Sequence, residues 1–245
     1  MTTTPGSSDA PTTPQAVHAD VLIIGASRGL GLAIAGEYLR RGSRVVATVR
    51  GSGAEALQQL AIETGGHVEI ERLDTTVVEQ VEAVRQRLAP RVFDLLLVNA
   101  GVTHDQALTA ADITTEEFTR VMVTNALAPV RLIEAFDGLV AADGTIAVMS
   151  SGQGSVARNT GGGWEIYRAS KAALNQLMRS YAARHHDDKR AVLLLAPGWV
   201  RTEMGGPQAA SSIEESVPPL ISTVEAQRRR PGLQYIDRHG QPVAW

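Results

Sequence analysis

Short apolar runs alternate with longer amphipathic segments along the chain from about residue 20 onward. The runs are rich in Val, Ile and Leu, and several are continuously apolar, as is typical of strands covered on both faces. The segments between them repeat apolar positions at helical spacing and are long enough to cross between parallel strands. The predicted strands are VLIIG from Val21, RVVATV from Arg44, HVEIERL from His67, FDLLLVN from Phe93, GTIAVMS from Gly144, AVLLLAP from Ala191 and a short seventh at 233–236. The predicted helices cover residues 29–41, 54–64, 76–88, 115–137, 165–185 and 213–230.

This alternation predicts an α/β fold, a single-domain Rossmann-type doubly wound parallel β-sheet with helices on both faces. Two helix starts carry the pattern of a capping box, Thr114 with Glu117 and Ser212 with Glu215. Ligands of such sheets bind outside the carboxyl ends of the strands. The residues that follow the strands are therefore the first candidates for a functional site.

The first 19 residues form a tract of Thr, Ser and Pro. Such a tract buries too little apolar surface to offset its ordering entropy, so we expect residues 1–19 to be a disordered N-terminal leader and residues 20–245 to form one domain. The leader has no apolar core of a signal peptide, and no run reaches the roughly 18 apolar residues of a membrane span. These features predict a cytoplasmic protein.

Charge and composition exclude several classes of function. With 23 basic and 26 acidic residues and a net charge of −3, the chain lacks the basic surface that nucleic acid or an anionic membrane requires. It has no cysteine, which excludes disulfides, thiolate metal sites and a cysteine nucleophile. The run His185–Asp188 reads as a solvated helix end, and no metal site is predicted. Arg228–Arg230 is interpreted as a helix C-terminus that complements the helix dipole.

The first predicted strand ends in a glycine-rich turn, GASRGLG, that opens a helix. Glycines let backbone amides approach a pyrophosphate, and a helix N-terminus supplies free N–H groups and a positive partial charge. The alternative is an ordinary tight turn. The candidate cofactor-binding residues of this turn are Gly25, Ser27, Arg28, Gly29, Leu30 and Gly31.

The second strand indicates which dinucleotide binds. An acid about 20 residues beyond the glycines binds the ribose 2′-hydroxyl of NAD, whereas an arginine there accommodates the 2′-phosphate of NADP. No acid lies between Glu37 and Glu55, and the strand ends in Arg50. Arg28 would supply a second guanidinium to the same phosphate. NADP(H) is therefore preferred and NAD(H) stays possible; the alternative is that both arginines are solvated surface residues.

Tyr167 and Lys171 lie four residues apart in a predicted helix and share one helix face. An ammonium so placed favours the phenolate and lowers a phenol pKa that is ordinarily about 10. The chain has only two lysines, Lys171 and Lys189, which indicates that a compact ammonium is needed here. The alternative is an ordinary pair on an exposed helix.

The ordered motifs of the chain resemble the short-chain dehydrogenase/reductase family. They are GASRGLG, Asn99-Ala100-Gly101, Ser150-Ser151, Tyr167 to Lys171, and Pro197-Gly198 followed by Thr202, and they span about residues 20–205. The segments MSSGQGSVARNTGGGWEIYRASKAALN and APGWVRTEMGG, with Trp245 at the end, are similar to the C-factor or sniffer-like carbonyl reductase branch.

The resemblance implies a role for each catalytic candidate. Tyr167 would be the general acid in carbonyl reduction and the base in the reverse reaction. Lys171 would lower its pKa and hold the nicotinamide ribose, and Ser151 would hydrogen-bond the substrate carbonyl. Asn125 resembles the family asparagine that relays protons through water to the lysine, and Pro129 would distort its helix and free backbone carbonyls.

The resemblance also implies the remaining cofactor contacts. Asn99, Ala100 and Gly101 would line the cofactor after the fourth strand, and Asp74 would hydrogen-bond the adenine. The nicotinamide carboxamide would be held by the segment after the sixth strand. The candidate residues in that segment are Pro197, Gly198, Val200 and Thr202.

Some of these positions have simpler interpretations. Asn125 and Asp74 are alternatively turn or capping residues, Thr202 caps a helix, and Ser150 is the active hydroxyl in place of Ser151. Tyr167 follows Ser151 by 16 positions, more than in most of the family, which predicts a flexible substrate-side loop. Ile24 replaces a common family threonine and puts a local hydrogen bond in doubt. Three apolar side chains either flank the pocket or pack in the core, namely Trp164, Trp199 and Met204.

The sequence therefore predicts an NADPH-dependent oxidoreductase that reduces a ketone or aldehyde to an alcohol. Two alternatives remain open, a dinucleotide-binding signalling or regulatory protein of the same fold and an NAD-preferring alcohol dehydrogenase. The expected partners are a small carbonyl or alcohol substrate and further copies of the chain. In the family, the helices near 115–137 and 165–185 commonly pair across a two-fold axis, which predicts a homodimer or homotetramer.

Overall fold

The computed structural model describes residues 19–51 and 53–245, and the predicted leader lies outside them except for Ala19. Ala19 is buried, and its carbonyl accepts a hydrogen bond from the Arg44 N–H. The strands are β1 (Asp20–Ile24), β2 (Arg44–Val49), β3 (His67–Arg72), β4 (Phe93–Val98), β5 (Val140–Met149), β6 (Ala191–Ala196) and β7 (Gly232–Asp237). The helices are α1 (Gly29–Arg40), α2 (Ala54–Thr64), α3 (Val78–Leu88), α4 (Thr115–Met122), η1 (Val123–Leu127), α5 (Ala128–Phe136), η2 (Asp137–Leu139), η3 (Gly152–Gly154), α6 (Glu165–Arg184) and α7 (Ile213–Gln227).

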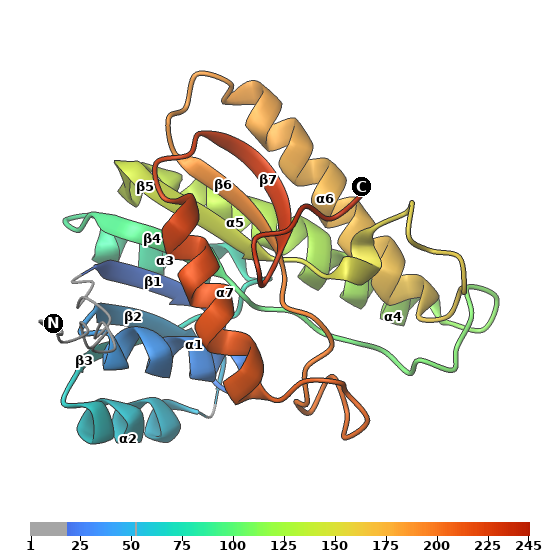
Figure 1. Ribbon diagram of the computed structural model, residues 1–245, viewed down its shortest axis with the longest axis horizontal. Coiled ribbons are helices and arrows are strands. Elements are labelled where there is room, and N and C mark those ends of the chain that lie inside the picture. Colours follow the sequence, from blue (N-terminus) through green and yellow to red (C-terminus); the bar gives the residue numbers. More distant parts are fainter. Residues whose placement is uncertain (1–18, 52) are drawn as a thin grey trace, which may run out of the picture.

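The strands form one parallel sheet in the order β3-β2-β1-β4-β5-β6-β7, as the alternating pattern predicts (Figure 1). The order reverses between β1 and β4, which is the switch point where ligands of such sheets bind. Continuously apolar strands such as β6, whose six residues are all buried, need a cover on both faces. The predicted fold class is confirmed.

Helices provide that cover on both sides of the sheet. One apolar cluster joins the sheet to α1, α2 and α7, with the ring of Tyr38 among its largest buried side chains. A second cluster joins the opposite sheet face to α3, α5 and α6 around Phe93, Phe136 and Tyr181. The sheet is therefore the rigid middle layer from which the connecting loops project.

The structure departs from the predicted boundaries in three elements. The single helix expected over 115–137 is α4, a π-helical turn η1 and α5, because Pro129 has no N–H to donate to the carbonyl four residues earlier. The fifth strand begins at Val140 rather than Gly144, with a shift of register opposite Phe93 and Leu95. The last helix ends at Gln227 rather than residue 230.

Side-chain caps set the start of two helices as predicted. Ser212 and Glu215 form the predicted reciprocal capping box on α7. At the start of α4 the Thr114 hydroxyl accepts the Glu117 N–H, but the Glu117 carboxylate pairs with Arg120, so only half of the predicted box is present. The arginines after α7 differ from the expectation, because they lie beyond the helix. Arg228 pairs with the Asp94 carboxylate of β4 and Arg229 with Asp143 of β5, so carboxylates rather than the helix dipole hold them.

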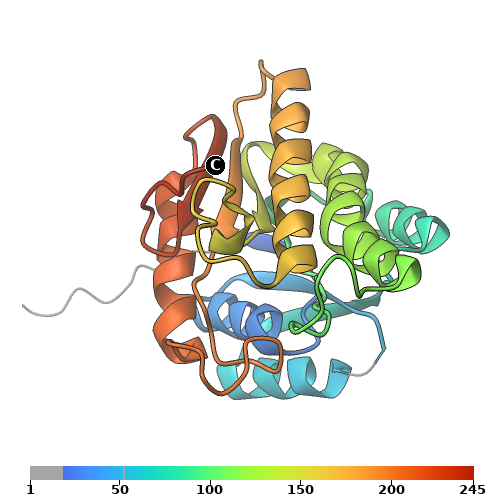
Figure 2. The same ribbon diagram turned by 90° about the vertical axis from the view of Figure 1, so that its right-hand side faces the viewer.

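The loops that follow β4, β5 and β6 gather at the edge where the strands end (Figures 1 and 2). The helix α6 lies beside them, with its first turns at this edge and its last turns far from it. In the part of the chain that the structure describes, no helix has the length and apolar character needed to cross a membrane.

Candidate active site

The glycine turn between β1 and α1 is packed so closely against neighbouring backbone that it has no room for side chains at Gly25 and Gly31. Gly25 has φ +89°, and a Cβ there would lie 2.8 Å from the Ala100 nitrogen. A Cβ at Gly31 would lie 2.1 Å from the Gly25 carbonyl oxygen. The first turn of α1 holds no acid, and its N-cap, Arg28, makes no side-chain capping bond. The first amides of α1 are therefore available to an anion, which fits a pyrophosphate.

Thr48 on β2 anchors this turn. Its hydroxyl accepts the Gly25 N–H at 3.0 Å, and its carbonyl accepts the Ala26 N–H at 2.8 Å. The neighbouring position Ile24 cannot supply a hydroxyl, and Thr48 makes a hydrogen bond to the turn from the next strand. Sequence reasoning missed Thr48, although it is the one hydroxyl in the apolar run RVVATV.

The two candidate arginines lie exposed at the ends of β1 and β2. The Arg28 guanidinium pairs with the Glu203 carboxylate at 2.5 Å, and both side chains are about three-quarters exposed (72% and 74%). The hydrogen bonds from Thr76 lower the pKa of the Asp74 carboxyl, and the nearby charge of Arg50 lowers it further. The Asp74 carboxylate accepts from the Thr76 hydroxyl and N–H, which is the turn contact that its simpler interpretation describes.

The segment after β4 connects the glycine turn to the helices behind it. The Asn99 amide donates to the Gly25 carbonyl at 2.9 Å. A Cβ at Gly101 would lie 3.4 Å from Asn125 Oδ1 and 3.7 Å from Lys171 Nζ. A single bare-backbone position therefore faces two of the candidate catalytic side chains.

Asn125 lies in the π-helical turn η1 and is fully buried. Its Oδ1 accepts the Val102 N–H at 2.8 Å, and its Nδ2 donates to the Val102 carbonyl and to the Ser170 hydroxyl. The π-turn and Pro129 thus place an asparagine against both the segment after β4 and α6. Ser170, which sequence reasoning did not single out, joins this network from the turn that carries Tyr167.

The structure separates the two serines at the end of β5. The Ser150 hydroxyl is buried and donates to Asn175 Oδ1 at 2.6 Å. The Ser151 hydroxyl instead lies beside the Tyr167 phenol, whose pKa it lowers, and accepts the Gln153 N–H at 3.1 Å. Ser151, not Ser150, is therefore the hydroxyl beside the phenol.

Tyr167 and Lys171 lie one turn apart on α6, as predicted. Lys171 Nζ is 5.8 Å from the centroid of the Tyr167 ring and donates to the Met149 carbonyl at 2.9 Å. Burial raises the pKa of Tyr167 to about 12, although the hydrogen bond to Ser151 lowers it, and burial lowers the pKa of Lys171 to about 8. The expected lowering of the phenol pKa is not produced by these residues alone, because desolvation outweighs the other contributions.

The segment after β6 lies against the glycine turn. Thr202 Cγ2 would be 3.7 Å from a Cβ at Gly29, and the Thr202 hydroxyl accepts the Gly205 N–H at 3.0 Å. Gly198 has φ +91°, and the Pro197 carbonyl accepts from Arg238. Of the predicted residues in this segment, Thr202 is brought to the turn directly. The backbone of the segment that carries Thr202 is held by a β-bridge between Val200 and Ser211.

Two tryptophans border the site rather than the core. Trp164 precedes α6 with a left-handed backbone (φ 54°), and its ring lies edge-on to Tyr167 with centroids 6.0 Å apart. Trp199 is half exposed and donates its indole N–H to the Gly205 carbonyl. Neither ring is buried in the apolar core.

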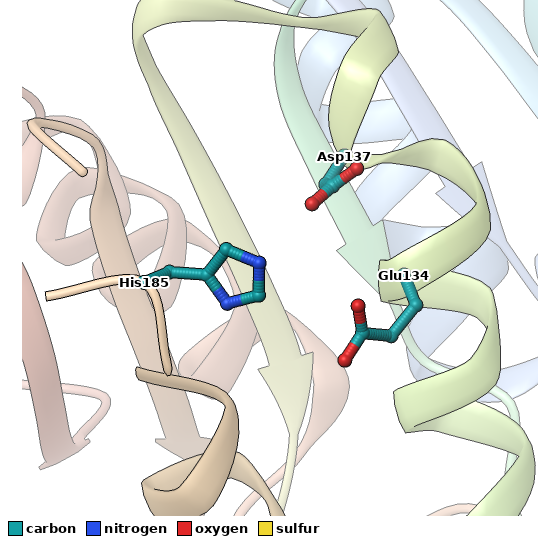
Figure 3. A group of neighbouring side chains, drawn as sticks. All are labelled: Glu134, Asp137 and His185. Carbon is teal, nitrogen blue, oxygen red and sulfur yellow. The ribbon is translucent and has the colours of Figure 1, made fainter. Parts of the chain in front are cut away.

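A second group of titratable side chains lies at the far end of α6 (Figure 3). Glu134 and Asp137 face the ring of His185. The group contains His185 and not the adjacent His186. Glu134 pairs with Arg184, Asp137 accepts from the Tyr181 hydroxyl at 3.2 Å, and His185 Nδ1 contacts the Tyr181 carbonyl at 2.9 Å. These contacts join the end of α5 to the end of α6.

Comparisons with known proteins agree with this geometry. A family model described as short chain dehydrogenase matches residues 19–212. The C-signal of Myxococcus xanthus is 35% identical over 154 residues, 62% of this chain and 92% of that protein. A structure from Burkholderia multivorans with bound NADP, named a short-chain dehydrogenase/reductase, is 51% identical with a TM-score of 0.90 and covers 93% of this chain and 100% of that chain.

A carbonyl reductase from Pseudomonas aeruginosa, solved in complex with NADP, is 39% identical with a TM-score of 0.86, over 93% of this chain and 100% of that chain. The predicted likeness to the C-factor and carbonyl reductase branch is confirmed by these relatives. The match spans every motif from the glycine turn to Thr202. The chain belongs to the short-chain dehydrogenase family.

Proposed function

We propose that the protein is an NADPH-dependent carbonyl reductase that converts a ketone or aldehyde to an alcohol. One observation carries the proposal: the Ser151 hydroxyl lies beside the Tyr167 phenol at the strand ends, with Lys171 Nζ 5.8 Å from the centre of the phenol ring. Burial raises the pKa of this phenol to about 12, so it is protonated at neutral pH. A protonated phenol beside a second hydroxyl is the arrangement that a carbonyl oxygen needs when it gains a proton. A protein that only binds a dinucleotide has no use for this pair.

The residues around the glycine turn fit a dinucleotide. Bare backbone at Gly25 and Gly31 and the free amides of α1 suit the pyrophosphate, and Arg28 and Arg50 suit a 2′-phosphate. Asn99 to Gly101 and Thr202 would line the cofactor between the turn and the catalytic pair. The NADP held by the Burkholderia and Pseudomonas relatives supports the preference for NADP(H) over NAD(H).

The bound cofactor supplies the hydride, and the side chains of this chain direct it. Ser151 donates a hydrogen bond to the substrate oxygen and stabilises the negative charge that develops there. Tyr167 donates its proton to that oxygen as the alcohol forms. Lys171, fixed on the Met149 carbonyl, keeps a positive charge near the phenol so that the phenolate left behind is stabilised. Asn125 holds the π-turn against this group.

The proposal is tested by turnover and binding of the purified protein. We expect NADPH absorbance to fall with one or more members of a panel of aliphatic and aromatic ketones and aldehydes, and to fall more slowly with NADH. In parallel, a ligand at 100 times its dissociation constant adds about 2.7 kcal/mol to the free energy of unfolding, so NADPH should raise the melting temperature more than NADH. A protein that binds neither cofactor and turns over no carbonyl would refute the proposal.

A further inference from the structure

Ser151 lies between two tyrosines on different elements. Its hydroxyl lies beside the Tyr167 phenol on α6, while its backbone carbonyl accepts a hydrogen bond from the Tyr235 hydroxyl on β7. Tyr235 is buried, with only 4% of its surface exposed. A bond to the carbonyl does not occupy the Ser151 hydroxyl, which can still donate its proton to a substrate oxygen. Tyr235 can therefore fix the position of this residue without competing for its reacting atom.

The last residues of the sequence fold back over Tyr235. The Val243 N–H donates to the Tyr235 carbonyl at 2.8 Å, and the Asp237 N–H donates to the Gln241 carbonyl at 2.9 Å. This return lays the Trp245 ring against Tyr235, with centroids 5.4 Å apart. The Arg179 guanidinium of α6 lies 4.5 Å from the centre of the same Trp245 ring. Aromatic and cation–π contacts of this kind restrict the ring that lies between their partners.

Trp245 also holds the loop between Ser151 and Tyr167. Its carbonyl accepts the Ala157 N–H at 3.0 Å and the Ser155 hydroxyl at 3.5 Å. Both views show the end of the chain beside this yellow loop (Figures 1 and 2). The later part of the loop, Gly161–Gly163, is exposed, and a Cβ added at any of its three glycines would have no atom within 4 Å. The loop is thus fastened to Trp245 at its serine end and exposed at its glycine end, where the Gly163 carbonyl accepts from Arg168 of α6.

We propose that Tyr235 and Trp245 form a clamp that positions Ser151 and the start of the substrate-side loop for carbonyl reduction. The inference rests on the proposed function of Ser151 and Tyr167. Tyr235 and Trp245 are positioning residues, because they act through the Ser151 carbonyl and the backbone at Ala157. The clamp is on the β7 side of the sheet and the cofactor arginines are at β1 and β2, so loosening it changes the catalytic step and leaves cofactor affinity intact.

The first test removes one hydroxyl. Tyr235→Phe keeps the ring that packs on Trp245 and deletes the hydroxyl that donates to the Ser151 carbonyl and lies beside Ser150 and Asn175. We expect kcat at saturating carbonyl and NADPH to fall about five- to tenfold with an unchanged NADPH Kd. Trp245→Ala should reduce kcat at least as much, and Trp245→Phe should restore most of it. The matched control is Tyr181→Phe, which deletes a buried phenol hydroxyl at the far end of α6 and should leave kcat unchanged.

The second test needs no substrate. Amide hydrogen exchange of residues 152–157 should be about tenfold faster or more in Trp245→Ala, and unchanged in Tyr181→Phe. Without its ring, residue 245 loses its contacts with Tyr235 and Arg179, so its backbone carbonyl is no longer held against the Ala157 N–H. Full kcat in Tyr235→Phe, with an inactive Tyr167→Phe, would overturn the clamp and leave the proposed function standing. Absence of turnover in the unaltered protein would overturn the proposed function, and unchanged exchange in Trp245→Ala would then still overturn the clamp.

Discussion

The two halves of the site are built differently. Around β5, β6 and β7 the functional groups are buried or half-buried and bonded: Lys171 donates to the Met149 carbonyl, Asn125 makes three hydrogen bonds, and Ser151 is held on both its hydroxyl and its carbonyl. At the ends of β1 and β2 the glycine turn is packed tightly, but the two arginines are exposed. The Arg28 guanidinium pairs with another exposed side chain, Glu203.

This difference follows from what each half has to do. Proton transfer needs a fixed geometry and controlled pKa values, and burial with hydrogen bonds provides both. Phosphate recognition needs charge that can reach an anion, and exposed guanidinium groups provide that. The consequence is that substitutions in the buried half should change the rate, whereas substitutions in the exposed half should change which dinucleotide binds.

Among the changes that leave the Tyr167 phenol in place, the largest expected effect comes from Ser151. Ser151→Ala removes the hydrogen-bond donor to the substrate oxygen, and we expect kcat to fall about 10²- to 10³-fold with little change in NADPH Kd. Ser150→Ala is the matched control, because that hydroxyl is buried and donates to Asn175. Steady-state kinetics with NADPH and one carbonyl measures both. A larger loss in Ser150→Ala than in Ser151→Ala would contradict the assignment.

The next effect is on stability rather than rate. Burial lowers the pKa of Lys171 from 10.5 to about 8, so holding the ammonium costs stability below pH 8, and this cost disappears as the pH rises through 10.5. Relative to Lys171→Met, the unaltered protein should gain about 3 kcal/mol between pH 7.5 and 10.5. Urea denaturation at several pH values measures the difference. The exposed second lysine gives the control, since Lys189→Met should show no such slope.

In the exposed half, the double variant Arg28→Ala/Arg50→Ala should lower the preference for NADPH. Each guanidinium that binds the 2′-phosphate makes charge-assisted hydrogen bonds, so their joint loss should raise the NADPH Kd about tenfold or more and leave the NADH Kd unchanged. Calorimetric titration with both cofactors measures this. Arg131→Ala, an exposed arginine on α5, controls for a general loss of charge. Equal weakening of NADH binding would contradict the role of the two arginines.

The smallest expected effect concerns the partner of Arg28. The Glu203 carboxylate occupies the guanidinium that the 2′-phosphate would contact, and exposed ion pairs contribute about 0 to 1 kcal/mol. Glu203→Gln should therefore strengthen NADPH binding by up to about fivefold without affecting NADH. The same titrations measure it. Weaker NADPH binding in this variant would show that Glu203 supports the site instead of competing for Arg28.

The sequence is sufficient for the sheet, the switch point and the catalytic group, because each depends on local patterns. Apolar strands, glycines after a strand and a tyrosine four residues before a lysine can all be seen along the chain. Asn125 was predicted, but the π-turn that carries it was not, because a helical periodicity cannot show which hydrogen bonds a proline removes.

Contacts between distant segments could not be predicted. The bond from Thr48 to the glycine turn, the pair of Arg28 with Glu203 and the bond from Tyr235 to Ser151 all join residues on different strands or loops. The raised pKa of Tyr167 also depends on how deeply the fold buries the ring. Spacing brings residues to one helix face but does not determine their solvation.

The most direct test of the account compares the activity and cofactor affinity of Tyr167→Phe with those of the unaltered protein. Removing the phenol hydroxyl deletes the proton donor and leaves the glycine turn and both arginines in place. The account predicts a loss of at least 10²- to 10⁴-fold in kcat for NADPH-dependent carbonyl reduction, with an NADPH Kd that is essentially unchanged. A Tyr167→Phe variant that binds NADPH equally well and reduces the carbonyl at the rate of the unaltered protein would contradict it.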